Sequence, residues 1–192
     1  MRAYQIAKSA GIDSLVEVDR PMPSPGYRQV LVKVAACSLN FRDLAIVLGR
    51  YRFPSKADLV PLSDGAGEVV AVGDGVTRFK AGDRIASCFF QGWSGGRAEP
   101  DTQSSALGGA LDGMLAEYAV LEEDGVVRVP EHLSLEEAAT LPCAAVTAWH
   151  ALVEHGRTIP GSRVLVQGTG GVSIFALQLA KLHGAEIAII SS

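Results

Sequence analysis

A strand-like apolar run leads straight into a glycine turn in the segment Val164-Leu-Val-Gln-Gly-Thr-Gly-Gly-Val-Ser173. An isolated pattern of this kind is weak, but here a helical pattern starts at Gly171 and a second apolar strand spans Glu186 to Ile190. A strand, a helix and a strand at this spacing predict one βαβ unit. Its two strands are expected to be parallel under the right-handed crossover rule.

The glycine turn predicts a site for the pyrophosphate of a dinucleotide. Glycine lets backbone N–H groups approach a phosphate, and the N-terminus of the following helix favours negative charge. The alternative is a strand–helix turn that only packs tightly. The pattern departs from G-x-G-x-x-G/A at its last position, where Ser173 is still small enough for helix–strand packing. The expected cofactor-binding residues of the turn are Gly168, Thr169, Gly170, Gly171, Val172 and Ser173.

The end of the second strand bears on the choice of cofactor. A chain that binds NAD has Asp or Glu about 20 residues beyond the turn, where it holds the adenosine ribose. Ser191 and Ser192 occupy that place here, so no carboxylate would repel a 2′-phosphate and two hydroxyls could donate to it. We therefore expect NADP(H). NAD(H) remains the alternative if Ser192 is only a strand end and the deciding basic residue lies beyond it.

Composition and charge exclude several other classes. Hydrophobic residues make up 48% of the 192 residues and charged residues 20%, which predicts a packed globular chain. The net charge of −4, with no basic run, gives no reason to expect nucleic acid. We find no apolar run of the ~18 residues that a membrane helix needs, and no secretory apolar region at the start. The three cysteines, Cys37, Cys88 and Cys143, are far apart, so reduced thiols and a cytoplasmic location are expected.

The character of the sequence changes near Val129-Pro130, which predicts two domains, 1–130 and 131–192. The first is rich in turns and strand patterns, and its residues 91–113 are rich in Gly and Ser and predict a long surface loop. Strands are expected over 29–36 and 67–73 and after the Gly-Asp turn of 79–85.

The second domain is expected to begin with helices. The capping box Ser134-Leu-Glu-Glu137 opens one helix, and Pro142 divides it from another over roughly 143–155.

Five segments together resemble a known family. The chain is similar to the medium-chain dehydrogenase/reductase superfamily, particularly its zinc-independent quinone oxidoreductase-like branch, some of whose members are named zinc-type alcohol dehydrogenases. The resemblance implies a β-rich GroES-like catalytic domain followed by an α/β Rossmann domain, with substrate bound between them. The segments are Cys37-Ser-Leu-Asn-Phe-Arg-Asp43, Pro61-Leu-Ser-Asp-Gly-Ala-Gly-Glu-Val-Val70, Val76 through Ile85, Leu141-Pro-Cys-Ala-Ala-Val-Thr-Ala-Trp149 and the glycine turn.

The resemblance also implies more chain than the 192 residues. A doubly wound cofactor domain needs about six strands and this sequence supplies two, so we expect an incomplete Rossmann domain that holds the first βαβ unit only. The full-length protein is expected to form a homodimer through Rossmann-domain sheet edges.

Zinc is not expected, although many members of the superfamily are zinc alcohol dehydrogenases. The positions that match their catalytic zinc ligands are Asn40, Ser63 and Cys143, and one thiolate does not make a catalytic site. The loop 91–113 contains no cysteine for a structural zinc lobe. The four histidines have no coherent ligand spacing and are expected at the surface or at helix ends: His132, His150, His155 and His183.

Four residues are candidates for the chemistry. Asn40 and Asp43 match the Asn-x-x-Asp of the zinc-independent branch, which lies against cofactor and substrate. At this spacing they are also typical of a helix N-terminal cap. Thr147 matches the family's nicotinamide-contacting threonine, and its alternative is helix core. Tyr51 is a candidate proton donor to a carbonyl oxygen, and its alternative is a surface aromatic.

Together the residues and the resemblance predict an NAD(P)H-dependent, zinc-independent oxidoreductase. Hydride would pass from the nicotinamide to a small quinone or α,β-unsaturated carbonyl, and nearby hydrogen-bond donors would stabilise the oxyanion that develops. Arg42 and Asp64 are possible polar neighbours of the site, and Cys37 and Cys143 are expected to be inert and buried. Two alternatives stay open: an NAD(P)-dependent alcohol dehydrogenase, and a non-catalytic nucleotide-binding regulatory protein.

Overall fold

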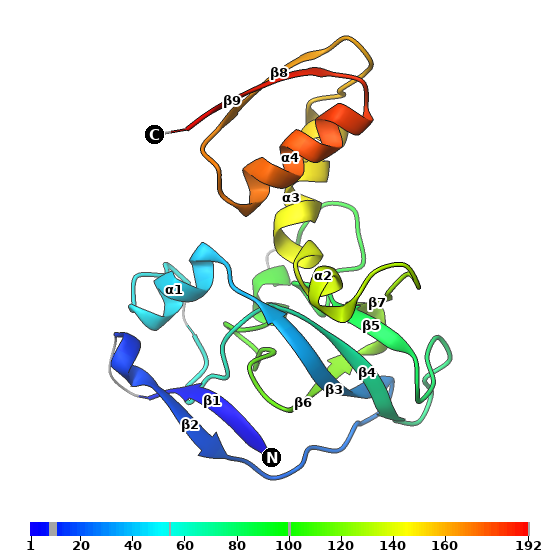
Figure 1. Cartoon of the computed structure of the whole chain (residues 1–192). Helices are drawn as coiled ribbons and strands as arrows, with labels where there is room; N and C mark the ends of the chain where they lie inside the picture. Colours follow the sequence, from blue (N-terminus) through cyan, green and yellow to red (C-terminus); the bar gives the residue numbers. More distant parts are fainter. Residues whose placement is uncertain (8–10, 54, 100, 192) are drawn as a thin grey trace. The chain divides into compact units, whose positions relative to one another are not determined.

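The computed structural model describes residues 1–7, 11–53, 55–99 and 101–191 (Figure 1). Its contacts divide the chain into two compact units, Met1–Pro142 and Cys143–Ser192. The expected fold class is confirmed, since a β-rich unit precedes a βαβ unit. The domain boundary expected near Val129-Pro130 stays a prediction. Among the described residues, no helix is long and apolar enough to cross a membrane.

The first unit is built on an antiparallel sheet in the order β6-β3-β4-β5-β7. Beside it, β1 pairs antiparallel with β2 (Figure 1). The strands are β1 (Arg2–Ile6), β2 (Leu15–Asp19), β3 (Gln29–Ser38), β4 (Asp64–Val72), β5 (Arg84–Ser87), β6 (Tyr118–Glu122) and β7 (Val126–Arg128). Short 3₁₀ turns span Ile12–Ser14, Thr102–Ser105 and Glu123–Gly125. The strands expected over 29–36, 67–73 and after 79–85 are therefore confirmed, each with slightly different ends.

Strand β3 lies at the centre of the core because apolar residues occupy both of its faces. Val30 and Val32 are fully buried on one face and pack in the main apolar cluster. The second cluster includes Ala138 and Ala139 of helix α2 (Leu135–Ala139), which packs on β3, β4 and β5. The capping box expected for this helix is confirmed: the Glu137 N–H donates to Ser134 Oγ over 3.1 Å, and the Ser134 N–H donates to the Glu137 carboxylate over 2.8 Å.

The segment 91–113 is more than the surface loop expected from its composition. Leu107 is 2% exposed and belongs to the main apolar cluster. The Leu107 N–H donates to the Phe89 carbonyl over 3.0 Å, and Phe90 forms a bridge with Ala106. The prediction was wrong for this part because the adjacent apolar residues Ala106 and Leu107, among glycines and serines, are both buried.

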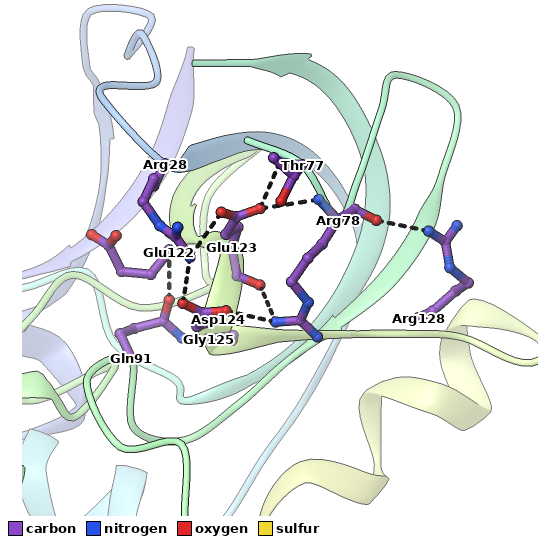
Figure 2. A network of polar contacts seen from close by, with 9 residues as sticks. All are labelled: Arg28, Thr77, Arg78, Gln91, Glu122, Glu123, Asp124, Gly125 and Arg128. Atoms are coloured by element: carbon purple, nitrogen blue, oxygen red, sulfur yellow. Dashed lines mark hydrogen bonds and ion pairs between the residues drawn. The ribbon is translucent and has the colours of Figure 1, made fainter. Parts of the chain in front are cut away.

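A buried carboxylate fixes the turn between β6 and β7 (Figure 2). Glu123 is 1% exposed and accepts the N–H groups of Thr77 and Arg78 at 2.9 and 3.1 Å. Its other oxygen pairs with Arg28 at 3.0 Å. Asp124 lies between Arg28 and Arg78, at 2.9 and 3.0 Å from their guanidinium nitrogens. The network joins three segments that are distant in sequence, and all of its charges have partners.

The second unit contains the expected βαβ arrangement. Strand β8 (Arg163–Gln167) pairs in parallel with β9 (Glu186–Ile190), and α4 (Gly171–Leu182) connects them (Figure 1). Ala176 and Ala180 of α4 are buried against these strands and against Leu152. This expectation is confirmed.

The two helical segments expected before β8 are present, but the break between them lies at Thr140 and not at Pro142. Helix α2 ends at Ala139, and Pro142 lies in a π-helical turn over Leu141–Ala145 that begins the second segment. Helical structure then continues through α3 (Val146–Trp149) and a second π-helical turn (His150–His155).

Candidate functional site

The glycine turn has the conformation and the open surface that a phosphate requires. Gly168 has a φ of +84°, which disfavours any side chain, and Gly170 is the extended N-cap residue of α4. A Cβ built on either glycine would meet nothing within 4 Å. The bare backbone of the turn is therefore exposed beside the N-terminus of a 12-residue helix, whose first N–H groups have no acceptor within the helix.

Two hydrogen bonds hold this turn in shape. The Gly168 N–H donates to the Ile190 carbonyl over 2.7 Å, which ties the turn to the end of β9. The Ser173 hydroxyl donates to the Gln167 carbonyl over 3.1 Å. Ser173 thus stabilises the turn from inside the first helical turn, a role that a glycine or alanine at this position could not perform.

The other expected residues of the second unit are exposed. Thr147 is exposed on α3. The alternative interpretation of Thr147, as a residue of the helix core, is therefore wrong for the second unit. Val172 is also exposed, and Ser191 follows β9 at the surface. Ser192 lies outside the described residues.

In the first unit, Asn40 and Asp43 form the N-terminal cap of helix α1 (Phe41–Val47). The Asn40 N–H donates to the Asp43 carboxylate over 2.8 Å, so the capping interpretation is confirmed. Asp43 is only 3% exposed, and burial raises the pKa of its carboxyl to about 6. The hydrogen bond from Asn40 and the charge of Arg42 oppose this rise in pKa, whereas nearby Asp64 adds to it.

The same cap holds buried polar atoms without a partner. They are Asn40 Nδ2, Arg42 Nε and Asp43 Oδ1, which belong to three of the four residues 40–43. More than nine in ten buried polar groups in proteins are hydrogen-bonded, so three unpaired atoms on one turn call for a physical reason. An amide nitrogen is a hydrogen-bond donor, and a carboxyl whose pKa is raised to about 6 keeps its proton closer to neutral pH than an ordinary aspartic acid does.

A second polar layer lies at the start of β4. The Ser63 hydroxyl donates to Asp64 Oδ1 over 2.6 Å, and both residues are fully buried. Leu62, just before them, has a φ of +73°, a conformation that is strained for a leucine. Gly108 and Gly113 lie so close to the Leu62 backbone that a Cβ on either would overlap it. The strained turn is thus held by close backbone packing.

Sequence reasoning named Arg42 only as a possible neighbour, but it is the residue that connects this site. Its guanidinium carbon lies 5.2 Å from the centre of the Tyr51 ring and 4.4 Å from that of Phe89. Its Nη1 donates to the Leu107 carbonyl over 2.8 Å. Tyr51 is half-buried against Arg42 and is not a loose surface aromatic. The signal in the sequence was an arginine inside the Asn-x-x-Asp motif.

The donor set does not fit zinc. Asn40 supplies a carboxamide and Ser63 a buried hydroxyl that already donates to Asp64. Across the described residues, we find no group of three His, Cys, Asp or Glu side chains placed to hold a metal ion. Cys37 is half-buried, its thiol donates to the Met114 carbonyl over 3.1 Å, and burial raises the pKa of the thiol to about 11. A protonated thiol of this kind is a poor metal ligand and a poor nucleophile.

The candidate residues therefore fall into two groups. Asn40 and Asp43 of the α1 cap and Tyr51, whose ring contacts Arg42, belong to the first unit. Thr147 and the glycine turn belong to the second unit.

Comparisons with known proteins cover both units of the chain. A family described as the alcohol dehydrogenase GroES-like domain matches residues 26–131. Over 189 residues the chain is 47% identical to a zinc-type alcohol dehydrogenase-like protein of Schizosaccharomyces pombe, with 95% of this chain and 54% of that protein covered. It is 35% identical to a chloroplastic quinone-oxidoreductase of Triphysaria versicolor, with 97% and 54% covered.

A solved structure extends the likeness to the fold. A cobalt- and zinc-bound thermostable alcohol dehydrogenase from Pyrobaculum aerophilum is 34% identical and superposes with a TM-score of 0.90, covering 100% of this chain and 59% of that one. The chain spans about half the length of the curated relatives it matches.

Proposed function

Because the chain belongs to the medium-chain dehydrogenase/reductase superfamily of oxidoreductases, we propose that its protein is an NADPH-dependent reductase that transfers hydride to a quinone or an α,β-unsaturated carbonyl without zinc. The observation that carries this proposal is the cap of α1. Asn40, which matches one of the zinc-ligand positions of the zinc enzymes, has an unpaired amide nitrogen, and Asp43 on the same helical turn has an unpaired carboxyl oxygen.

The chemistry of a conjugated acceptor suits such a site. Hydride adds to the β-carbon, or to the quinone, and the electron pair that is displaced moves onto the carbonyl oxygen. That oxyanion needs a hydrogen-bond donor and then a proton, and a conjugated acceptor needs no metal because it already holds the electron sink. One well-placed donor contributes about 3 kcal/mol to the transition state. Asn40 is proposed as the donor, and Asp43 and Tyr51 as the acids close to it.

The glycine turn of the second unit supports the cofactor part of the proposal. Its open backbone and the N-terminus of α4 suit a pyrophosphate, which Gly168 to Ser173 would hold. NADP is favoured over NAD because hydroxyls, and no carboxylate, follow β9. Thr147 is proposed to contact the nicotinamide. When bound, the cofactor supplies the hydride.

An alcohol dehydrogenase is the second candidate, because the Schizosaccharomyces pombe relative carries that name. Alcohol oxidation requires removal of the hydroxyl proton, which a zinc ion commonly assists. The residues at the ligand positions, Asn40 and Ser63, favour the reductase over this candidate.

The test uses the full-length polypeptide that carries this chain. We expect NADPH absorbance to fall when quinones and enones are added, faster than NADP⁺ is reduced with a matched series of alcohols. A zinc chelator should leave the rate unchanged. A rate that is lost on chelation and restored by zinc would refute the metal-free mechanism. NADPH binding without turnover of any acceptor or alcohol would instead favour a regulatory protein.

A further inference from the structure

We propose that Arg42, which lies on the first turn of α1 between Asn40 and Asp43, is a positioning residue that holds the Tyr51 ring, and that Gly109 provides the space for its guanidinium. The catalytic part of this inference rests on the reductase function proposed above. The geometric part does not, and it is tested separately.

The first observation is the stack around the guanidinium. Its carbon lies 4.4 Å from the ring centre of Phe89 and 5.2 Å from that of Tyr51. A planar cation attracts the faces of aromatic rings within about 6 Å, so Arg42 joins these two side chains. Tyr51 also contacts Phe53, with ring centres 5.7 Å apart. The Tyr51 ring is thereby fixed on two sides.

The second observation is that the guanidinium is itself immobilised. Nη1 donates to the Leu107 carbonyl over 2.8 Å, and Leu107 is anchored in the main apolar cluster. A Cβ at Gly109 would overlap Nη2. Gly109 is not among the glycines with a left-handed backbone, so the effect of a side chain at this position would be to push the flexible end of Arg42 aside. The core therefore fixes the position of Arg42, and Arg42 fixes Tyr51.

The third observation is the place of Arg42 in the sequence of the cap. It lies between Asn40 and Asp43 on the first turn of α1, and its charge opposes the rise in the pKa of Asp43. Since the cap and Tyr51 share one arginine, a shift of Arg42 alters the position of the proposed acids together. Lysine cannot replace it, because an ammonium has no planar face and cannot stack between two rings.

The kinetic test is a double-mutant cycle in the full-length protein. Arg42→Lys should lower kcat and kcat/KM together by about tenfold, because a group used in the transition state is misplaced. Tyr51→Phe should lower them by at least as much. If Arg42 acts through Tyr51, adding Arg42→Lys to Tyr51→Phe lowers the rate no more than twofold further. If the rate of the double variant falls by the product of the two single losses, the inference is overturned. Arg128→Lys is the matched control, because Arg128 is an exposed arginine that also lies over a phenylalanine ring, that of Phe79, and its rate should stay unchanged.

The geometric test needs no activity. The protein is labelled with 3-fluorotyrosine, and the ¹⁹F resonance of Tyr51 is assigned by its loss in Tyr51→Phe. This resonance should shift in Arg42→Lys and in Gly109→Ala, which displaces the guanidinium but keeps the arginine, and it should not shift in Arg128→Lys. A Tyr51 resonance that stays in place in both variants would overturn the inference. If the wild type turns over no acceptor, the proposed function fails, while the resonance shifts still decide the role of Arg42.

Discussion

Asp43 shows at the scale of one residue how a buried carboxyl weakens the fold that holds it. Burial raises its pKa in the folded protein to about 6, from 3.8 in the unfolded chain. The folded protein therefore binds this proton more tightly than the unfolded chain does. The contribution of Asp43 to stability is greatest below pH 3.8 and is lost as the pH rises through 6. Above pH 7 the ionised carboxyl costs about 3 kcal/mol of stability.

Asp43→Asn is expected to raise the free energy of unfolding at pH 8 by roughly 1–3 kcal/mol, because the neutral amide keeps the acceptor for the Asn40 N–H without the buried charge. The gain should vanish near pH 4. Urea unfolding at both values of pH measures it, with Asp74→Asn at the surface as the control. The same variant should lose at least tenfold in kcat if Asp43 takes part in the reaction. Equal stability gains at pH 4 and pH 8 would contradict the assignment.

At the scale of elements, features that depend on nearby residues could be predicted from the sequence, whereas contacts between distant residues could not. The cap of α1 and the capping box of α2 follow from residues three apart, and the βαβ unit follows from a glycine turn between two apolar runs. The stack of Arg42 on Phe89 depends instead on how the sheet brings together residues far apart in sequence. The burial of Leu107 was hidden for a similar reason, because the glycines and serines around it dominate the composition of its segment.

Leu107→Ala tests this correction of the segment 91–113. Loss of a leucine from the main apolar cluster should lower the free energy of unfolding by about 2–5 kcal/mol, since the cavity it leaves closes only in part. Leu111→Ala is the matched control from the same segment, because Leu111 is 38% exposed, and its loss should stay below about 1 kcal/mol. Equal losses in chemical denaturation would mean that the segment does not belong to the core.

At the scale of the whole molecule, the two units respond differently to substitution. In the second unit a Cβ on Gly170 meets nothing within 4 Å, and its backbone is in an ordinary extended conformation. Gly170→Ala should therefore leave the thermal unfolding temperature nearly unchanged and weaken NADPH binding about tenfold or more, because the methyl group occupies the space next to the pyrophosphate. Calorimetric titration of the full-length protein measures the affinity. An unchanged affinity for NADPH would mean that the glycine turn does not bind the cofactor.

The loss of stability at acid pH is expected to depend on Glu123 in the first unit. Hydrogen bonds from the N–H groups of Thr77 and Arg78 lower the pKa of Glu123 below its usual 4.5. Its contribution is therefore present above pH 4.5 and is lost as the pH falls through the lower, folded value. Glu123→Gln should flatten the decline of stability in acid, whereas Glu122→Gln at a partly exposed site should not. Circular dichroism during acid titration distinguishes the two.

The packing of Gly108 and Gly113 against Leu62 also shapes what variation this chain tolerates. These contacts are made by backbone atoms. A clash caused by a new side chain at either glycine therefore cannot be relieved by a second substitution to a smaller side chain. A saturation mutagenesis screen that scores folded protein should show nearly all replacements at these two glycines depleted, although neither presents a reactive group. Intolerance to mutation near this site would then reflect the geometry of the main chain as much as the chemistry beside it.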